Sequence, residues 1–526
     1  MTSPLKTRAG IGLAAALTMA LPAAAQEMTI IRLLDSNHYD PPRTAALAGS
    51  EVIFMLADTL VALDEDMKTI HPLLATSWEV SDDALTYTFH LRDDVSFCDG
   101  KKMTADDVVY SLNRWNDPET KSPVRWRMGD VKSITAPDAT TVVYELNAPH
   151  SELLYQLAQS FGSVIDKETV EELGDDFGVT GFNGTGPFCW ESWAPRDKMV
   201  MTRHEAYNWG PPMYENTGPA QVEKMTFQVV PEAATRTVAM LTGQGDVSPY
   251  IPYIGWEKLR QAPTVEVIRS DEAFFTNYIG FKITRDLVND IKVRQAINLA
   301  VNQEAMAEDL FFGEVEPAFS YLSSGALDYD DSEDDKLLTY DPEKAAALLD
   351  EAGWTLNSDG VREKDGVELA PLAITFTGDW QQVVEAVQAD LLKVGIKMQI
   401  EPMDATVYWG KSATDDFDMY VMGYPYVSSG DGLNLYFRSE NIPTPNRMNY
   451  SDPETDELLL AGSQATTDAD RAAAYAQVLH KVQGEAIWLP VYHQPMQIAL
   501  SSKVKPFEAH NIYGVGTYKG LQLGFK

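Results

Sequence analysis

The chain has 526 residues, with 41 basic and 78 acidic side chains, and a formal net charge of −37 at pH 7. A charge this negative argues against binding to nucleic acid phosphates or to an anionic membrane surface, and solubility is its simplest explanation. The length exceeds what one hydrophobic core usually serves, so we expect two or three domains.

The N-terminus has the pattern of a secretory signal peptide. Lys6 and Arg8 precede a short apolar run over residues 11–21, and three alanines at 23–25 precede Gln26. The run is shorter than the roughly 20 residues that a membrane span needs. No cysteine lies near the predicted cleavage site to carry a lipid anchor. We therefore predict that residues 1–25 are removed near Ala25, and that the mature protein resides free in the periplasm without membrane insertion.

The sequence contains only two cysteines, Cys98 and Cys189. In an oxidising compartment an even pair is a candidate disulfide, and two buried thiols are the alternative.

Predicted strands and helices alternate along the first half of the chain. A strand at 28–31 leads into a polar loop at 35–42, where Asn37 and His38 are candidate ligand contacts, and a helix is expected at 44–60. Residues 85–91 alternate as a half-buried strand does, and Thr104 is placed to cap a following helix. Trp126 and Arg127 follow that helix.

The second half continues the alternation. We expect a loop at 248–256 that contains Tyr253, a helix at 290–301, and a helix that starts after Asp341. A strand-helix-strand unit at 372–401 precedes a loop at 423–432 that is rich in small and aromatic residues. A helix at 468–483 and a strand at 487–492, with His493 at its end, complete the pattern. Such alternation predicts α/β domains.

No catalytic motif stands out in this pattern. The sequence lacks a G-x-S-x-G elbow, an H-E-x-x-H helix and a phosphate-binding G-K-[ST] loop. His38 with Asp35 and Asp40 is the only compact His/Asp group near a candidate site, and one flexible loop does not fix a metal geometry. We predict that the protein is not an enzyme and carries no cofactor or metal.

Several motifs resemble the family 5 extracellular solute-binding proteins of bacterial ABC importers, a group that includes oligopeptide-, dipeptide-, nickel- and glutathione-binding proteins. The longest match runs from Pro72 to Ser111 and includes S-W, T-Y-T-F-x-L-R, D-G and T-A-x-D-V. Further matches are G-T-G-P-F at 184–188, V-R-Q-A-I at 293–297 and Y-D-P-E-K-A at 340–345. Together the motifs span nearly all of residues 30–495.

The resemblance implies a two-lobed α/β periplasmic-binding-protein fold that closes on its ligand by a hinge. Residues 26–272 and 490–526 would form lobe I, with an extra subdomain at about 52–183, and residues 273–489 would form lobe II. The partners would be the ligand and the membrane subunits of an ABC permease, and the protein would be a monomer.

The resemblance also suggests which residues line the ligand site. In many peptide-binding relatives a D-Y-x-D-P run near 423–432 supplies an aspartate for the α-ammonium; this chain lacks the run, and Asp431 is the candidate substitute. Arg127 or Arg438 would hold a carboxylate. Ser428 belongs to an S-S-G-D run that resembles the glutathione-binding branch. Candidate aromatic walls, for which core packing is the alternative, are Trp126, Tyr250, Tyr253, Trp380, Trp409, Tyr424 and Tyr426.

Three ligand classes remain open at this point. The first is a short peptide or a glutathione-like peptide. The second is an oligosaccharide or another solute that stacks on aromatic rings. The third is a nickel chelate, with His38 or His493 near the metal.

Overall fold

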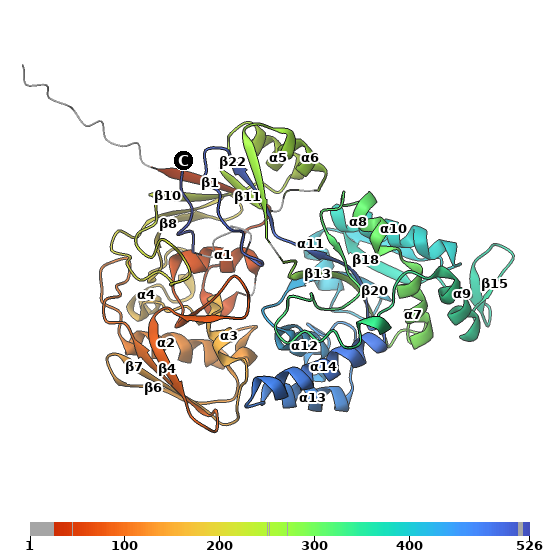
Figure 1. Cartoon of the computed structure of the whole chain (residues 1–526), viewed down its shortest axis with the longest axis horizontal. Coiled ribbons are helices and arrows are strands. Elements are labelled where there is room, and N and C mark those ends of the chain that lie inside the picture. The colour runs from red at the N-terminus through yellow and green to blue at the C-terminus, as the bar shows by residue number, and fades with distance from the viewer. Residues whose placement is uncertain (1–25, 45, 250, 252, 271, 514–518) are drawn as a thin grey trace, which may run out of the picture.

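Two bodies, each built on a large β-sheet, lie side by side in the computed structural model (Figure 1). The structure describes residues 26–44, 46–249, 251, 253–270, 272–513 and 519–526. The predicted signal peptide and Tyr250 lie outside the described residues. Strands and helices alternate in both bodies, which confirms the predicted α/β class.

The first body contains strands from both ends of the chain. Its seven-stranded sheet has the order β12-β22-β11-β1-β10-β9-β8, and β1 pairs in parallel with β10 and β11. The bounds are β1 (Glu27–Arg32), β8 (Phe188–Ala194), β9 (Lys198–Arg203), β10 (Lys224–Val229), β11 (Val247–Pro249), β12 (Val265–Arg269) and β22 (Gln497–Ser501). Its larger helices are α1 (Leu47–Leu56), α5 (Ala233–Leu241) and α6 (Tyr253–Gln261).

The second body is built on a six-stranded sheet of order β14-β21-β13-β20-β18-β19. The bounds are β13 (Phe275–Phe281), β14 (Glu316–Pro317), β18 (Leu372–Phe376), β19 (Gln399–Met403), β20 (Met419–Pro425) and β21 (Trp488–Gln494), with a small sheet of β15 (Thr355–Leu356), β16 (Arg362–Lys364) and β17 (Val367–Glu368). Its helices are α7 (Ile291–Ala300), α8 (Gln303–Asp309), α9 (Pro342–Glu351), α10 (Asp379–Lys393), α11 (Ala405–Lys411), α12 (Ser429–Phe437), α13 (Pro453–Ser463) and α14 (Asp468–Gly484).

The chain crosses between the two large sheets twice. It leaves the first sheet after Arg269 and enters the second at Phe275, and it returns between Gln494 and Gln497. The predicted boundary at 489/490 falls inside β21. That strand stays in the second sheet because its pairing with β13 continues as far as Gln494, which lies opposite Phe275.

A smaller four-stranded sheet of order β4-β5-β7-β6 lies within residues 52–183 and belongs to the first body in Figure 1. Its strands are β4 (Ala75–Val80), β5 (Thr86–Leu91), β6 (Val131–Asp138) and β7 (Thr141–Leu146). The same region contains a two-stranded sheet of β2 (Val61–Leu63) and β3 (Ile70–Pro72), and the helices α2 (Ala105–Asn116), α3 (Leu153–Leu157) and α4 (Lys167–Leu173). Side chains of β5 alternate between buried and half-buried, as its sequence predicts. Thr104 and Asp107 form a capping box at the start of α2.

A disulfide joins Cys98 to Cys189, with 5.7 Å between the two Cα atoms. It connects the loop before α2 to β8 of the seven-stranded sheet. Among the described residues, no helix combines the length and apolar character needed to cross a membrane.

Three sequence predictions about local structure are wrong. The helix expected at 44–60 covers only Leu47–Leu56, because the backbone is extended at Ala46 and again at Ala57. The loop expected at 248–256 ends at Tyr253, where α6 begins. The loop expected at 423–432 covers only 426–428, because 423–425 end β20 and 429–432 form the first turn of α12.

The glycines of α12 explain the last error. Gly430 suggests a loop in the sequence, but in the structure a side chain there would collide with Glu152 and Tyr475. The glycine therefore permits close packing inside a helix. Ser428 caps that helix by accepting a hydrogen bond from the backbone N–H of Asp431 at 3.0 Å.

Candidate functional site

A cavity of about 370 Å³ is lined by residues from both bodies. Its first-body wall includes the end of β1, the residues after it and α1, with side chains such as Arg32, Leu34 and Glu51. Its second-body wall includes Phe275, Trp409 and the segment 423–431 around the end of β20. Ligand sites of proteins are typically apolar pockets of roughly 300–1,000 Å³ with a few placed polar groups.

Three predicted ligand residues line this cavity: Arg127, Tyr424 and Asp431. Trp409, one of the candidate aromatic wall residues, also lines the cavity and is 48% exposed to solvent. The structure brings these residues together from four separate segments. Arg127 lies in a 3₁₀ turn at Arg125–Met128, Trp409 in α11, Tyr424 in β20 and Asp431 in the first turn of α12.

Arg127 and Asp431 form an ion pair between the two bodies. A guanidinium nitrogen lies 2.8 Å from the Asp431 carboxylate, and each side chain is only 2% exposed. Arg127 also donates to the Tyr424 hydroxyl at 2.9 Å and to the side-chain oxygen of Gln156 at 3.2 Å. The sequence predicted that the two residues would bind opposite ends of a ligand, whereas here they bind each other.

The surroundings favour the charged form of Arg127. Burial lowers the pKa of its guanidinium, but the Asp431 carboxylate and the Tyr424 hydroxyl outweigh that effect, so the net shift is upward. The guanidinium also lies 5.1 Å from the centre of the Trp126 ring and 5.3 Å from that of Phe161. Such positions over aromatic rings stabilise a cation.

Glu152, at the start of α3, lies beside this ion pair and was missed by the sequence analysis. It is 2% exposed and accepts hydrogen bonds from the hydroxyl groups of Ser428 and Tyr475 in the second body, the latter at 3.0 Å. Burial raises the pKa of its carboxyl to about 7; the two hydrogen bonds oppose the rise and the Asp431 charge adds to it. The carboxyl therefore titrates near neutral pH at the contact between the bodies.

Tyr426, Ser428 and His493 lie close to the cavity without lining it. The Tyr426 hydroxyl is bonded at 2.6 Å to Thr276, whose own hydroxyl lies 3.0 Å from Nδ1 of His493. Burial lowers the pKa of His493 to about 4, which leaves its imidazole neutral at pH 7. All three side chains are buried. Their contacts stabilise the protein around the cavity.

Asn37, His38 and Trp126 in the first body do not line the cavity. Asn37 is exposed and His38 is half-buried in the loop after β1. The residues of this segment that line the cavity are Leu33 and Leu34, which come directly after the strand. Trp126 contacts the guanidinium of Arg127, which does line the cavity.

Tyr253, Trp380 and Arg438 do not line the cavity either. The Tyr253 ring packs edge-on against Phe311 at 4.7 Å. The Trp380 ring lies 6.3 Å from that of Tyr492. Arg438 follows α12 and donates to the side-chain oxygen of Asn434 at 2.8 Å, so its guanidinium serves the structure of this region.

Arg32, Leu34, Glu51 and Phe275 line the cavity although no motif singles them out. For Leu34 and Phe275 the sequence offered one signal, their position at the end of a predicted strand: Leu34 follows β1 and Phe275 begins β13. Arg32 is engaged already, with an ion pair to Asp35 at 2.7 Å and a bond to Tyr39 at 2.6 Å.

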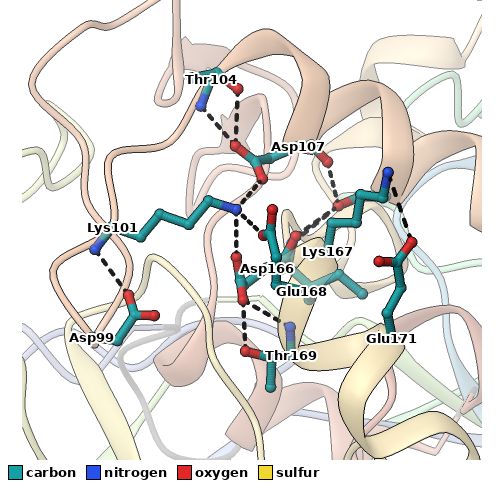
Figure 2. A network of polar contacts seen from close by, with 11 residues as sticks. Asp99, Lys101, Thr104, Asp107, Asp166, Lys167, Glu168, Thr169 and Glu171 are labelled. Atoms are coloured by element: carbon teal, nitrogen blue, oxygen red, sulfur yellow. Dashed lines mark hydrogen bonds and ion pairs between the residues drawn. The ribbon is translucent and has the colours of Figure 1, made fainter.

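Two clusters of described residues have donor atoms close enough together to hold a metal ion, and neither lines the cavity. One combines His204 with the two cysteines, which are joined in the disulfide. The other groups Asp107, Asp166 and Glu168 around the ammonium of Lys101, as Figure 2 shows. Lys101 lies 3.0 Å from Asp107 and 2.7 Å from Asp166, and it also pairs with Glu168. The ammonium group of Lys101 thus occupies the position between these carboxylates that a metal ion would take.

Two sheets joined by two crossings, with a cavity lined from both sides, define a two-lobed binding protein. The sequence profile of bacterial extracellular solute-binding proteins, family 5 Middle, matches residues 69–442. The chain belongs to this family, which confirms the resemblance in its motifs, and it is a solute-binding protein.

Curated relatives extend over almost the whole chain. Heme-binding protein A of Haemophilus influenzae is 28% identical over 508 residues, which cover 90% of this chain and 88% of the relative. Glutathione-binding protein GsiB of Escherichia coli K12 is 27% identical over 507 residues, which cover 94% of each chain.

Solved structures share the fold. The periplasmic binding protein DppA from Helicobacter pylori, in complex with the peptide STSA, has a TM-score of 0.81 and 24% identity, covering 95% of this chain and 98% of its own. NikA from Brucella suis, in complex with Fe(III)-EDTA, has a TM-score of 0.83 and 24% identity, covering 95% and 100%. These matches confirm the predicted two-lobed fold.

Proposed function

We propose that this protein is the receptor of an ABC importer for a short peptide or peptide-like solute. The solute binds in the cavity between the bodies, closure buries it, and the closed form docks on the membrane permease. Such a mechanism requires that the ligand bind the closed form more tightly than the open form.

The observation that carries the proposal is the cavity itself. Its walls come from both bodies, so a molecule held there contacts both and favours closure. Its volume of about 370 Å³ lies at the lower end of the usual range for ligand sites, which suits a short peptide better than a long one. The names of GsiB and of the DppA complex support a glutathione or peptide ligand by analogy.

A solute that stacks on aromatic rings is the second candidate, and one observation favours it. Trp409 and Phe275 both line the cavity, and the tryptophan is 48% exposed. Aromatic faces of this kind bind sugar rings as well as apolar side chains. The nickel-chelate hypothesis has no such support, because His38 and His493 do not line the cavity.

The remaining parts of the proposal concern the protein as a whole. The two bodies act as lobe I (residues 26–272 and from about 495 onward, with the extra subdomain at 52–183) and lobe II (residues 273 to about 494). The mature protein is a periplasmic monomer without its first 25 residues. It works without a cofactor, does not bind nucleic acid and does not transform its ligand.

Thermal unfolding of the purified protein with peptides, glutathione, oligosaccharides and metal chelates tests the proposal. A peptide or glutathione should raise the melting temperature by mass action and be recovered unchanged. Leu34→Trp should abolish this rise, because Leu34 lines the cavity and is 61% exposed. Leu460→Trp is the matched control, since Leu460 is 46% exposed and does not line the cavity. No rise with any peptide, or an unaltered rise in Leu34→Trp, would contradict the proposal.

A further inference from the structure

Residues 150–152, directly before α3, form a contact between the two bodies. The backbone N–H of Ser151 donates to the carbonyl of Ser463 at 2.8 Å, and the Ser151 hydroxyl donates to the carbonyl of Gly462 at 2.8 Å. Both acceptors lie in α13 of the second body. A hinge motion that separates the bodies breaks these bonds and brings residues 150–152 into water.

The residues on either side of Ser151 are ionisable, and both are buried in this contact. His150 is 8% exposed and Glu152 is 2% exposed. Nε2 of His150 donates to the carbonyl of Arg127 at 2.9 Å, and the Glu152 carboxyl accepts from two hydroxyl groups of the second body. All of these partners are uncharged. A charge buried among uncharged partners is costly, and such a group usually becomes neutral instead.

The charges around Glu152 leave it in need of a proton. Burial is the main cause that raises its pKa to about 7; Asp431 of α12 adds to the rise, while its hydrogen bonds and Arg471 of α14 oppose it. Both of these neighbouring charges have partners of their own: Asp431 pairs with Arg127 at 2.8 Å, and Arg471 pairs with Asp328 at 2.6 Å. The carboxyl therefore takes up a proton when the contact forms near neutral pH.

His150 responds to the same contact in the opposite direction. Burial lowers the pKa of its imidazole to about 4, and Arg438, which follows α12, adds to this effect. The hydrogen bonds with the backbone of Arg127 and of Ser463 oppose it. A histidine that is protonated in water therefore releases its proton when the contact forms.

We propose that closure of the two bodies discharges His150 and Glu152 together, so that one proton is released and one is taken up and closure depends little on pH. Where the open form carries an imidazolium and a carboxylate, the closed form carries a neutral imidazole and a carboxylic acid, and the proton count is unchanged. The inference rests on the proposed closure of the bodies, and it does not depend on which ligand they hold.

The two groups bias closure with opposite signs. In the closed form the pKa of Glu152 is about 7 and that of His150 about 4, against ordinary values of 4.5 and 6.5 for the open form. Glu152 therefore favours closure at low pH, and His150 favours it at high pH. Between about pH 5 and about pH 7.5, each group alone would change the closure constant by at least roughly tenfold, whereas together they change it by less than about threefold.

The distance between two spin labels in the ligand-free mature protein tests the inference. Val80→Cys in β4 and Leu460→Cys in α13 place one label in each body, at positions that are 44% and 46% exposed. The two native cysteines form the disulfide, so only the introduced cysteines take up the label. In the parent, the ratio of closed to open distances should change by less than about threefold between about pH 5 and about pH 7.5.

Single variants should reveal the two titrations. Acidification should lower the closed-to-open ratio at least roughly tenfold in Glu152→Gln, and it should raise the ratio by a similar factor in His150→Gln. The double variant should again depend little on pH. Glu172→Gln, at an exposed glutamate, is the matched control and should behave as the parent does.

Three results would overturn the inference: a tenfold change in the parent, no change or a change of the wrong sign in Glu152→Gln, or one unvarying distance in every protein. If His150→Gln does not fold, Glu152→Gln still decides, because its ratio alone must fall on acidification. Peptide binding is measured separately by thermal unfolding. A peptide that binds while the variants show no response would therefore contradict only this inference, and the expected response without any binding peptide would contradict only the ligand assignment.

Discussion

Replacement of Glu152 by Gln should change how the stability of the protein depends on pH. Glu152 is buried, and its carboxyl pKa is raised from 4.5 to about 7. A raised pKa means that the folded protein holds this proton more tightly than the unfolded chain does. The group therefore costs stability as the pH rises from 4.5 to about 7, and the glutamine variant lacks that cost.

The size of the effect follows from the shift. At roughly 1.4 kcal/mol for each pH unit, the rise from 4.5 to about 7 corresponds to about 3 kcal/mol. Glutamine keeps a similar shape and still accepts a hydrogen bond from Ser428 or Tyr475. When the pH is raised from about 4.5 to about 7.5, the parent should thus lose about 3 kcal/mol of unfolding free energy relative to the variant.

Urea unfolding at several pH values between these limits measures this difference directly, since shared titrations cancel between parent and variant. Glu172→Gln is the matched control. Glu172 is an exposed glutamate, and its replacement should give the same dependence of stability on pH as the parent shows. Parallel profiles for the parent and Glu152→Gln would refute the reasoning, because they would show that the buried carboxyl does not change its protonation between the two states.

Three further predictions concern other parts of the chain. Trp409→Ala should weaken binding of a captured peptide by roughly tenfold in calorimetry, whereas Val407→Ala, a similarly exposed position outside the cavity, should not; equal losses would contradict the site. Cys98→Ser should lower the free energy of unfolding by about 2–5 kcal/mol while ligand affinity is retained, and unchanged stability would argue against the disulfide. Asp40→Asn breaks a buried carboxylate's two bonds of 2.6 Å to Arg114 and should cost about 3–5 kcal/mol in urea unfolding; a loss below 1 kcal/mol, expected of a surface pair, would contradict the burial.

The sequence predicts well what short-range chemistry determines. The alternation at 85–91 and the cap at Thr104 correspond to β5 and α2, because burial of one face and capping act between near neighbours. Asp341 caps α9 as its pattern predicts. The first turn of α12 escaped prediction because Gly430 is needed for packing against Glu152 and Tyr475, residues that lie far away in the sequence.

The candidate site was only partly predictable for the same reason. Arg127, Tyr424 and Asp431 were identified from residue type and from their positions near the family motifs. Their role changed, because the ion pair between Arg127 and Asp431 exists only where the two bodies meet. Glu152 is unremarkable in a chain with 78 acidic residues, and its raised pKa arises mainly from burial between the bodies, with a contribution from the Asp431 charge.

Capture of a solute between two lobes is most directly tested by hydrogen exchange of the mature protein, with and without a peptide that raises its melting temperature. The account predicts that bound peptide slows exchange at 31–34 and 47–51 in the first body and at 423–431 in the second, all at the same peptide concentration. Protection in only one body, or protection confined to segments outside the cavity, would contradict the claim that the ligand is held between them.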